Sequence, residues 1–277
     1  MRLIDAHQHF WTIGGPGQRW PDADWPAIYR DFGADDLRTA AGGLDLVGSV
    51  LVQSQPDDRD TDWMIETADD DPLVKAIVGW VDLDRTAAPD RIAALARQPK
   101  LVGLRPMLQA IDDSEWILRD ALAPAIAAMP AHGLRFDALV QPRHLRPLHT
   151  FATRWPDLPI VIDHGAKPFA ASGTLDPWRD DMAALAQLPN VWCKLSGLRT
   201  EQTPGQPADA LAPYVAHILA CFGDRTMWGS DWPVLLHAGD SYADWVRDAR
   251  RLAGPLDEAA QARLFVGAAT EFYGLDA

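Results

Sequence analysis

Residues 2–9 of the chain read Arg-Leu-Ile-Asp-Ala-His-Gln-His, a short apolar run that ends in polar side chains. Short apolar, β-branched runs that are bounded by turn residues are typical of buried strands. Comparable runs recur along the whole chain, and they predict eight strands: Arg2–Ala6, Val47–Gln53, Lys75–Val81, Leu101–Arg105, Leu134–Val140, Ile160–His164, Val191–Leu195 and Met227–Asp231.

Helical patterns fill the segments between these runs, for example Asp90–Gln98, Ser114–Met129, Asp180–Gln187, Ala212–Cys221 and Tyr242–Leu252. Strands that alternate with helices form βαβ units and a parallel sheet. Eight such units in 277 residues match the size of a (β/α)₈ TIM barrel. We therefore expect a single α/β barrel domain over residues 1–277, with a doubly wound open sheet as the alternative.

The chain is acidic, with 39 Asp and Glu residues against 25 Lys and Arg residues and a formal net charge of −14. The chain contains no run of Lys and Arg residues. Its acidic charge therefore argues against binding to nucleic acid or to an anionic membrane surface. The N-terminus shows no secretory signal pattern, and the apolar segments are too short to span a bilayer. We expect a cytoplasmic protein, and its oligomeric state, monomer or homo-oligomer, stays open.

The first predicted strand ends in two histidines, His7 and His9, with Asp5 two residues earlier. Because alternate side chains of an extended strand share a face, Asp5, His7 and His9 are expected to point the same way. Two imidazoles that are two residues apart at a strand end can hold one divalent cation or orient one water.

Two later strands also end in ionisable residues. The sixth ends in Asp163 and His164, and alternation lets only one of them face the barrel axis. We expect His164 to face the site and Asp163 to serve the strand–helix layer or to orient a neighbour. The eighth ends at Asp231, a carboxylate that can act first as a general base and then as an acid. Because the carboxyl ends of barrel strands meet at one mouth, these residues should converge there with the two histidines of the first strand.

Six segments with characteristic motifs are spread from residue 4 to residue 275: Ile4–Trp11, Val102–Gln109, Val161–Pro168, Cys193–Leu198, Met227–Pro233 and Phe265–Leu275. The most specific are Asp5-Ala6-His7-Gln8-His9 and Gly229-Ser230-Asp231-Trp232-Pro233. Together they resemble the amidohydrolase superfamily, specifically the amidohydrolase-related branch that includes sugar lactonases and the pyrone dicarboxylate lactonase. The resemblance covers the whole chain in order and implies a TIM barrel with a hydrolytic site.

The resemblance also implies a metal site, with one departure. The wider superfamily builds a binuclear centre with a Lys or Glu from the fourth strand and a His from the fifth, where this chain has Arg105 and Val140-Gln141-Pro142. Arginine stays protonated and is a poor ligand. We expect one divalent ion, zinc, whose need for activity stays open, held by residues of three strand ends: His7, His9, Asp231 and, as a further candidate, His164.

The reaction implied by the resemblance is hydrolysis of a carboxylic ester bond in a lactone. Asp231 is expected to take a proton from the attacking water and to return it to the departing ring oxygen. His7 and His9 are expected to hold the ion or to hold the carbonyl and the water directly, while His164 stabilises the oxyanion.

Further side chains near the predicted mouth are candidates for binding a sugar lactone: Gln53, Arg105, Lys194, Trp11, Trp232 and His237. Indole faces stack on sugar rings, and amides suit sugar hydroxyls. These features favour an aldonolactone of the L-fucono or L-galactono type over a carboxylated non-sugar lactone, which stays an alternative. Arg105 and Lys194 are also consistent with salt bridges in the barrel core.

Two other functions stay open from the sequence. One is a metal-dependent decarboxylase of the same superfamily, and the other is a barrel that binds a ligand without turnover. Two irregular stretches, Trp11–Ala34 and Arg199–Ala208, follow the first and seventh strands. Loops at this position cover the mouth of a barrel, so each is expected to be either a lid or an ordinary connection.

Overall fold

The computed structural model describes residues 1–69 and 71–276, and its centre is one sheet of eight parallel strands in sequential order. Each strand pairs with the next one along the chain. The sequential order confirms the predicted (β/α)₈ TIM barrel, since a doubly wound sheet has a switch point in its strand order. The strands are β1 (Arg2–Gln8), β2 (Asp45–Val52), β3 (Val74–Gly79), β4 (Leu101–Leu104), β5 (Arg135–Ala138), β6 (Ile160–Ile162), β7 (Val191–Leu195) and β8 (Thr226–Trp228).

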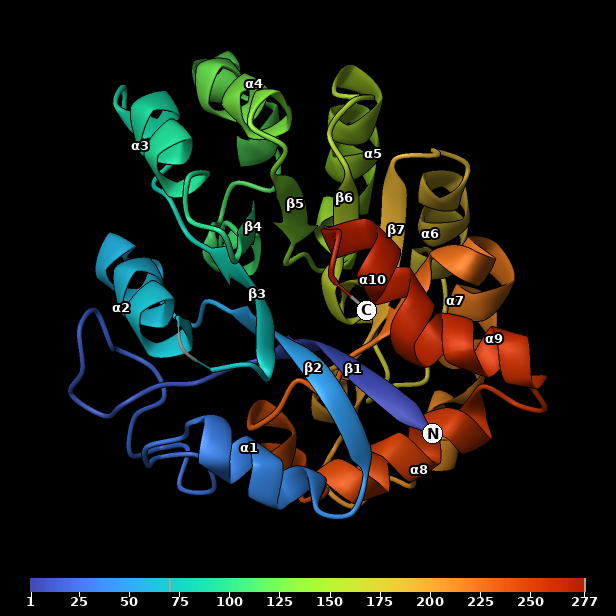
Figure 1. Ribbon diagram of the computed structural model, residues 1–277. Helices are drawn as coiled ribbons and strands as arrows, with labels where there is room; N and C mark the ends of the chain where they lie inside the picture. The colour runs from blue at the N-terminus through green and yellow to red at the C-terminus, as the bar shows by residue number, and fades with distance from the viewer. Residues whose placement is uncertain (70, 277) are drawn as a thin grey trace.

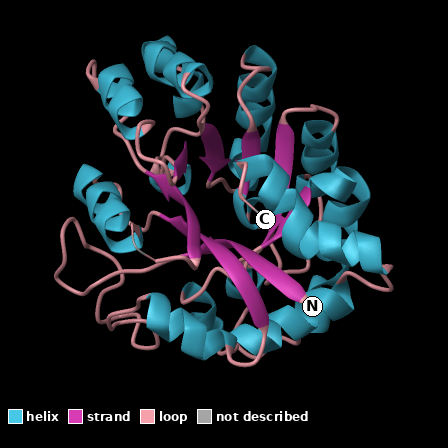
Figure 2. Cartoon of the chain, viewed as in Figure 1, coloured by secondary structure: helices cyan, strands magenta, loops and turns pink. Residues whose placement is uncertain are grey.

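Helices alternate with the strands and surround them as an outer layer (Figure 1, Figure 2). Among the described residues, none of the helices has the length and apolar character needed to cross a membrane. The helices are α1 (Ala34–Ala41), α2 (Asp58–Ala68), α3 (Ala88–Leu95), α4 (Ala123–Ala131), α5 (Leu145–Arg154), α6 (Trp178–Ala186), α7 (Ala212–Phe222), α8 (Tyr242–Leu252), α9 (Glu258–Ala262) and α10 (Ala268–Tyr273).

The first and last strands meet through the end of β1 and the segment that follows β8. The backbone N–H of Asp231 donates to the carbonyl of His7 at 2.8 Å, and the N–H of His9 donates to the carbonyl of Trp232 at 2.8 Å. Strand β8 is only three residues long, so the segment after it makes this junction. The seam of the barrel therefore lies at the place where the candidate site residues are found.

The apolar core has one part inside the barrel and another between the barrel and its helices. Inside, side chains such as Ile4, Val50 and Ala76 pack with Phe272 and Tyr273 of the carboxyl-terminal helix. Figure 1 shows this helix, α10, inside the ring of outer helices and against the strands. Apolar packing thus fills the interior next to α10, and the other end of the barrel carries polar side chains.

Six of the eight predicted strands end one to three residues earlier than expected, and two of these differences involve catalytic candidates. β6 ends at Ile162 and β8 at Trp228, whereas the sequence patterns carried them to His164 and Asp231. The backbone φ angles of His164 and Asp231 are 54° and 57°, in the left-handed region, so neither residue can continue a strand. The two strand ends that carry predicted site residues are therefore sharp turns.

The predicted helix Ser114–Met129 is wrong in its first half. The chain forms short 3₁₀ turns at Trp116–Leu118 and Asp120–Leu122 before α4 begins. Between them Arg119 has extended backbone angles (φ −64°, ψ 130°), which interrupt a continuous helix. The apolar spacing of this segment resembles a helix, but its backbone turns before the helix starts.

Candidate active site

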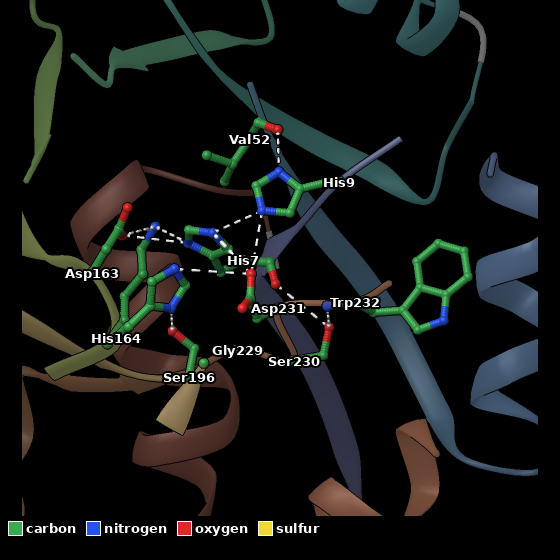
Figure 3. Close-up of polar contacts among 12 residues, drawn as sticks. His7, His9, Val52, Asp163, His164, Ser196, Gly229, Ser230, Asp231 and Trp232 are labelled. Atoms are coloured by element: carbon green, nitrogen blue, oxygen red, sulfur yellow. Dashed lines mark hydrogen bonds and ion pairs between the residues drawn. The ribbon is translucent and has the colours of Figure 1, made fainter. Parts of the chain in front are cut away.

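Three imidazoles and one carboxylate meet at the carboxyl ends of the strands (Figure 3). His7 and His9 lie at the end of β1, His164 in the turn after β6, and Asp231 in the segment after β8. Nε2 of His9 lies 3.2 Å from Nε2 of His7 and 3.3 Å from Oδ1 of Asp231. The same carboxylate oxygen lies 3.6 Å from His7 Nε2 and 3.9 Å from His164 Nε2. The fold therefore brings together the side chains that the sequence placed at three separate strand ends.

A bulge in β1 determines which of its side chains face the site. Between Asp5 and Gln8 the register against β2 shifts, so strict alternation is lost and His7 turns inward. The expectation that Asp5 shares the site face is wrong. Its carboxylate accepts hydrogen bonds from the N–H and Oγ of Ser230, at 2.8 and 2.6 Å, and from the hydroxyl of Tyr242 at 3.0 Å. Asp5 thus supports the segment that presents the catalytic candidate of β8.

The turn after β6 directs two neighbouring side chains into the barrel. Because the strand ends at Ile162 and His164 is left-handed, Asp163 and His164 are both buried on the inner side. The expectation that Asp163 serves the helix layer is wrong, although it does orient a neighbour, since its Oδ1 lies 3.3 Å from His7 Nδ1. Gly197 leaves room for this turn, because a Cβ at that position would lie 2.3 Å from His164 Nδ1.

Neighbouring groups that can only donate or only accept a hydrogen bond indicate which ring nitrogens of His7 and His9 carry the proton. Nδ1 of His9 is 2.7 Å from the Val52 carbonyl, which only accepts, so Nδ1 carries the proton and Nε2 a lone pair. The guanidinium of Arg105, which only donates, lies 3.3 Å from His7 Nε2, so that nitrogen also presents a lone pair. Its proton is then on Nδ1, facing Asp163. Two lone pairs and a carboxylate oxygen at this spacing repel one another unless a cation lies among them.

His7, His9 and Asp231 fit a divalent metal ion. All three are buried, and their ligand atoms lie within 4.8 Å of one another. Two imidazole nitrogens and a carboxylate oxygen form a typical catalytic zinc set that leaves a coordination position for water or substrate. The bond from His9 Nδ1–H to the Val52 carbonyl is the kind of outer contact that orients a metal-binding imidazole. The described residues therefore suit the single ion expected from the sequence.

A buried ion-pair network lies next to this cluster. Nζ of Lys194 is 2.6 Å from Asp137 Oδ2 and 3.0 Å from Asp163 Oδ1, and Nη1 of Arg105 is 3.3 Å from Asp163 Oδ2. Burial alone would raise the pKa of Asp163, but Lys194, His7 and Arg105 hold it well below its usual range. Burial also holds the pKa of His7 well below its ordinary value, so this imidazole is neutral.

Sequence reasoning missed two residues that shape the site. Asp137 belongs to the ion-pair network, and Ser196 lies with its Oγ 2.9 Å from Nδ1 of His164. A charged residue in the apolar run Phe136-Asp137-Ala138 is a signal that could have identified the first of them. Ser196 carried no comparable signal, since an isolated serine after a strand is common in loops.

Asp231 and His164 differ in charge. Burial by itself raises the pKa of Asp231, but the rings of His164, His9 and His7 outweigh it and lower the pKa below its usual range. Burial lowers the pKa of His164 to about 4. The site therefore pairs an ionised carboxylate with a neutral imidazole at neutral pH.

The polar candidates for substrate binding lie in different places. Gln53 donates from Nε2 to the Arg105 carbonyl at 2.8 Å, while its buried Oε1 has no hydrogen-bond partner among the residues that the structure describes. Arg105 lies beside His7, and its guanidinium also contacts the Gln53 carbonyl. Lys194 is fully buried in the ion-pair network, which matches its alternative interpretation as a core salt bridge.

The aromatic candidates and His237 lie around the cluster rather than within it. The ring centroid of Trp11 is 6.4 Å from that of His9, but its indole is buried. Trp232 points away from the histidines in Figure 3 and packs against Phe32 with ring centroids 5.2 Å apart. His237 contacts the Trp25 ring at 4.5 Å between centroids, in the loop that follows Asp231 along the chain.

The two irregular loops are held by specific contacts. In the first, Gln55 accepts from the Arg19 N–H at 2.9 Å and donates to the Trp20 carbonyl at 2.5 Å. In the second, Arg199 pairs with Asp240 at 2.5 Å. These contacts connect the first loop to the segment after β2 and the second loop to the residues before α8, and lid movement stays a prediction.

Comparisons with known proteins agree with this architecture. The model of the amidohydrolase family matches residues 4–275. L-fucono-1,5-lactonase of Burkholderia ambifaria is 48% identical over 99% of this chain and 96% of its own, and L-fucono-1,5-lactonase of Burkholderia multivorans is 34% identical over 98% and 96%. A crystal structure of an amidohydrolase from Burkholderia multivorans with bound zinc superposes with a TM-score of 0.92, at 32% identity and full coverage of both chains. With its sequential barrel and clustered histidines, the chain belongs to the amidohydrolase family.

Proposed function

We propose that this protein hydrolyses a sugar lactone to the sugar acid, and that an L-fucono-type aldonolactone is the substrate to test first. The observation that carries the proposal is the carboxylate of Asp231, held at 3.3–3.9 Å from three histidine nitrogens at the end of the barrel. The 48% identity to an L-fucono-1,5-lactonase over nearly the whole chain supports it.

Asp231 acts as the general base in this proposal. Its low pKa keeps the carboxylate ionised and able to accept a proton from a water that attacks the lactone carbonyl. The bond between the carbonyl carbon and the ring oxygen then breaks, and Asp231 returns the proton to that oxygen. General acid–base catalysis of this kind contributes about 10²–10⁴-fold to the rate.

The histidines supply binding and charge stabilisation. An ion held by His7, His9 and Asp231 would polarise the carbonyl and lower the pKa of a bound water. His164 is neutral, and its Nε2 faces the Asp231 carboxylate, which only accepts, so the ring proton is favoured on Nε2. Nδ1 can then accept from the Ser196 hydroxyl. Nε2 therefore donates a hydrogen bond to the oxyanion that forms during attack.

The charged side chains near the mouth favour a neutral substrate over a dicarboxylate. Arg143 is committed to loop carbonyls, including that of Ile111 at 2.8 Å, and Arg199 is paired with Asp240. Neither guanidinium is therefore free to bind a substrate carboxylate. The buried Oε1 of Gln53 can instead accept a hydrogen bond from a sugar hydroxyl, and the half-buried indole of Trp25 offers a ring face.

A pH-indicator assay on a panel of lactones tests the proposal. The panel contains L-fucono- and L-galactono-lactones, a D-aldonolactone and a carboxylated non-sugar lactone, each assayed with and without a chelator. We expect the fastest acid release from the L-aldonolactones. If no aldonolactone is hydrolysed in either arm, the proposal is wrong. The chelator arm shows whether the ion is required, and full activity in that arm excludes the metal-dependent decarboxylase.

A further inference from the structure

Two clusters of possible metal ligands share His7. The first, His7, His9 and Asp231, is the candidate metal site described above, and the second comprises His7, Asp163 and His164. Both are buried, and in both the ligand atoms lie within 4.8 Å of one another. From ligand chemistry alone, the barrel could hold two ions that are bridged by one imidazole.

The second cluster already contains a cation that belongs to the protein. Nζ of Lys194 lies 3.0 Å from Asp163 Oδ1 and 3.1 Å from His7 Nδ1, two of the ligand groups of that cluster. It also lies 2.6 Å from Asp137 Oδ2. Two of the three donors of the ammonium reach these two carboxylates. Nδ1 of His7 carries the ring proton, which faces Asp163, so it offers no lone pair to a second ion.

The local charges balance without a second ion. Asp137 and Asp163 contribute two negative charges, and Lys194 and Arg105 contribute two positive charges, all from residues with 3% exposure or less. A divalent ion added beside Asp163 would introduce an excess of positive charge into a region screened from water, which is costly. The first cluster is different. Arg105 lies 3.3 Å from His7 Nε2, but the contacts recorded between the other two acceptors, His9 Nε2 and Asp231 Oδ1, join them directly at 3.3 Å.

We infer that Lys194 is the permanent second cation of this centre, so that the protein binds one divalent ion and His7 binds it through Nε2 alone. Nδ1 of His7 faces Lys194 and Asp163, and this contact holds the ring so that Nε2 points toward His9. Lys194 is therefore a positioning residue rather than a catalytic one. The inference concerns the site of the proposed lactonase, but it is tested by counting metal, so a failure of lactone hydrolysis leaves it standing.

The test measures zinc per folded chain by equilibrium dialysis and elemental analysis. Three proteins are compared: the wild type, Lys194→Ala, and Lys194→Ala/Asp163→Asn. The double variant removes one positive and one negative charge together with a ligand of the second cluster. We expect one ion in the wild type and one in the double variant. We expect two in Lys194→Ala, because Arg105 is then the remaining cation for the two carboxylates of Asp137 and Asp163.

Two ions in the wild type, or one ion bound with unchanged affinity in a folded Lys194→Ala, would overturn the inference. If Lys194→Ala does not fold, wild-type crystals soaked in zinc decide the question by anomalous scattering. A single peak among His7, His9 and Asp231 supports the inference, whereas a second peak within bonding distance of Asp163 contradicts it.

Discussion

The backbone N–H of Asp231 donates to the carbonyl of His7 at 2.8 Å, and the side chains of the same two residues lie 3.6 Å apart between Oδ1 and Nε2. One contact joins the last strand to the first, and the other joins the proposed base to a proposed metal ligand. Closure of the barrel and alignment of the site therefore depend on the same pair of residues. A movement of the backbone where β1 meets the segment after β8 must change the distance between the proposed base and the proposed metal ligand, and with it the reaction rate.

Gly229→Ala tests this dependence. A Cβ at Gly229 would lie 2.8 Å from the Cβ of His7 and 3.0 Å from its backbone nitrogen, so the end of β1 must move. A displacement near 1 Å in an active site costs on the order of 10²-fold in rate. We expect kcat/KM on the lactone to fall by about that factor in a protein that still folds by circular dichroism. Gly43→Ala is the control, since a Cβ there meets nothing within 4 Å. Equal activity in the two variants would show that the seam does not position the site.

His9→Ala should remove the ion with little loss of fold. The imidazole contributes Nε2 to the cluster and makes one further bond, from Nδ1 to the Val52 carbonyl. Losing an outer partner of a metal ligand weakens binding about 10–100-fold, and losing the ligand itself should exceed that range. The measurement is zinc affinity by competition with a chromophoric chelator. His149→Ala, on the outer helix α5, serves as the control, and similar affinities for the two variants would contradict the assignment of His9 as a ligand.

Asp60 should make stability depend on pH in the direction opposite to a salt-bridged carboxylate. Burial raises the pKa of Asp60 to about 6 from 3.8, so the folded protein holds its proton more tightly than the unfolded chain. The resulting stability is complete below pH 3.8 and is lost as the pH rises through about 6, a change of about 3 kcal/mol. In Asp60→Asn this change should disappear. The variant keeps the two backbone hydrogen bonds, because the N–H groups of Ser54 and Gln55 both donate to one oxygen, Oδ2.

Urea unfolding of the wild type and Asp60→Asn at several pH values between 4 and 7 checks this prediction. The free energy of unfolding of the wild type should fall relative to that of the variant as the pH rises. A difference between the two proteins that does not change with pH would mean that Asp60 titrates alike in the folded and unfolded states.

Gln55→Leu should loosen the loop between Trp11 and Ala34. The side chain accepts from the Arg19 N–H and donates to the Trp20 carbonyl, and Leu leaves both groups without this partner. Because both backbone groups belong to residues that are not fully buried, the loss is nearer the net value of a hydrogen bond, about 0.5–1.5 kcal/mol each. We expect faster amide hydrogen exchange in this loop and a higher KM with a small change in kcat. Gln98→Leu, at an exposed position, is the matched control, and unchanged exchange in the loop of Gln55→Leu would refute the anchoring role.

Much of the fold follows from sequence patterns because buried strands are short apolar runs. Strand β7 has the predicted bounds Val191–Leu195, and helix α8 the predicted bounds Tyr242–Leu252. Errors occur where the backbone leaves regular geometry. The left-handed φ angles of His164 and Asp231 shorten two strands, and nothing in the local composition reveals such angles for residues other than glycine.

The same distinction applies to the site. A histidine or aspartate at a strand end can be identified in a barrel because strand ends converge, and His7, His9, His164 and Asp231 do meet. The directions expected for the side chains of Asp5 and Asp163 were wrong, because a bulge and a left-handed turn each break the alternation of side chains. The partners of Lys194 come from β5 and from the turn after β6, so its environment depends on the closed barrel and not on neighbouring sequence.

The most direct test of the central claim is the turnover of L-fucono-1,5-lactone by Asp231→Asn compared with the wild type and with Asp120→Asn, whose side chain is fully exposed. Asn keeps the size of the side chain but cannot accept the proton of the attacking water. We predict that the wild type and Asp120→Asn hydrolyse the lactone at equal rates, and that Asp231→Asn loses about 10²–10⁴-fold in kcat. Turnover by Asp231→Asn at the wild-type rate would contradict the account.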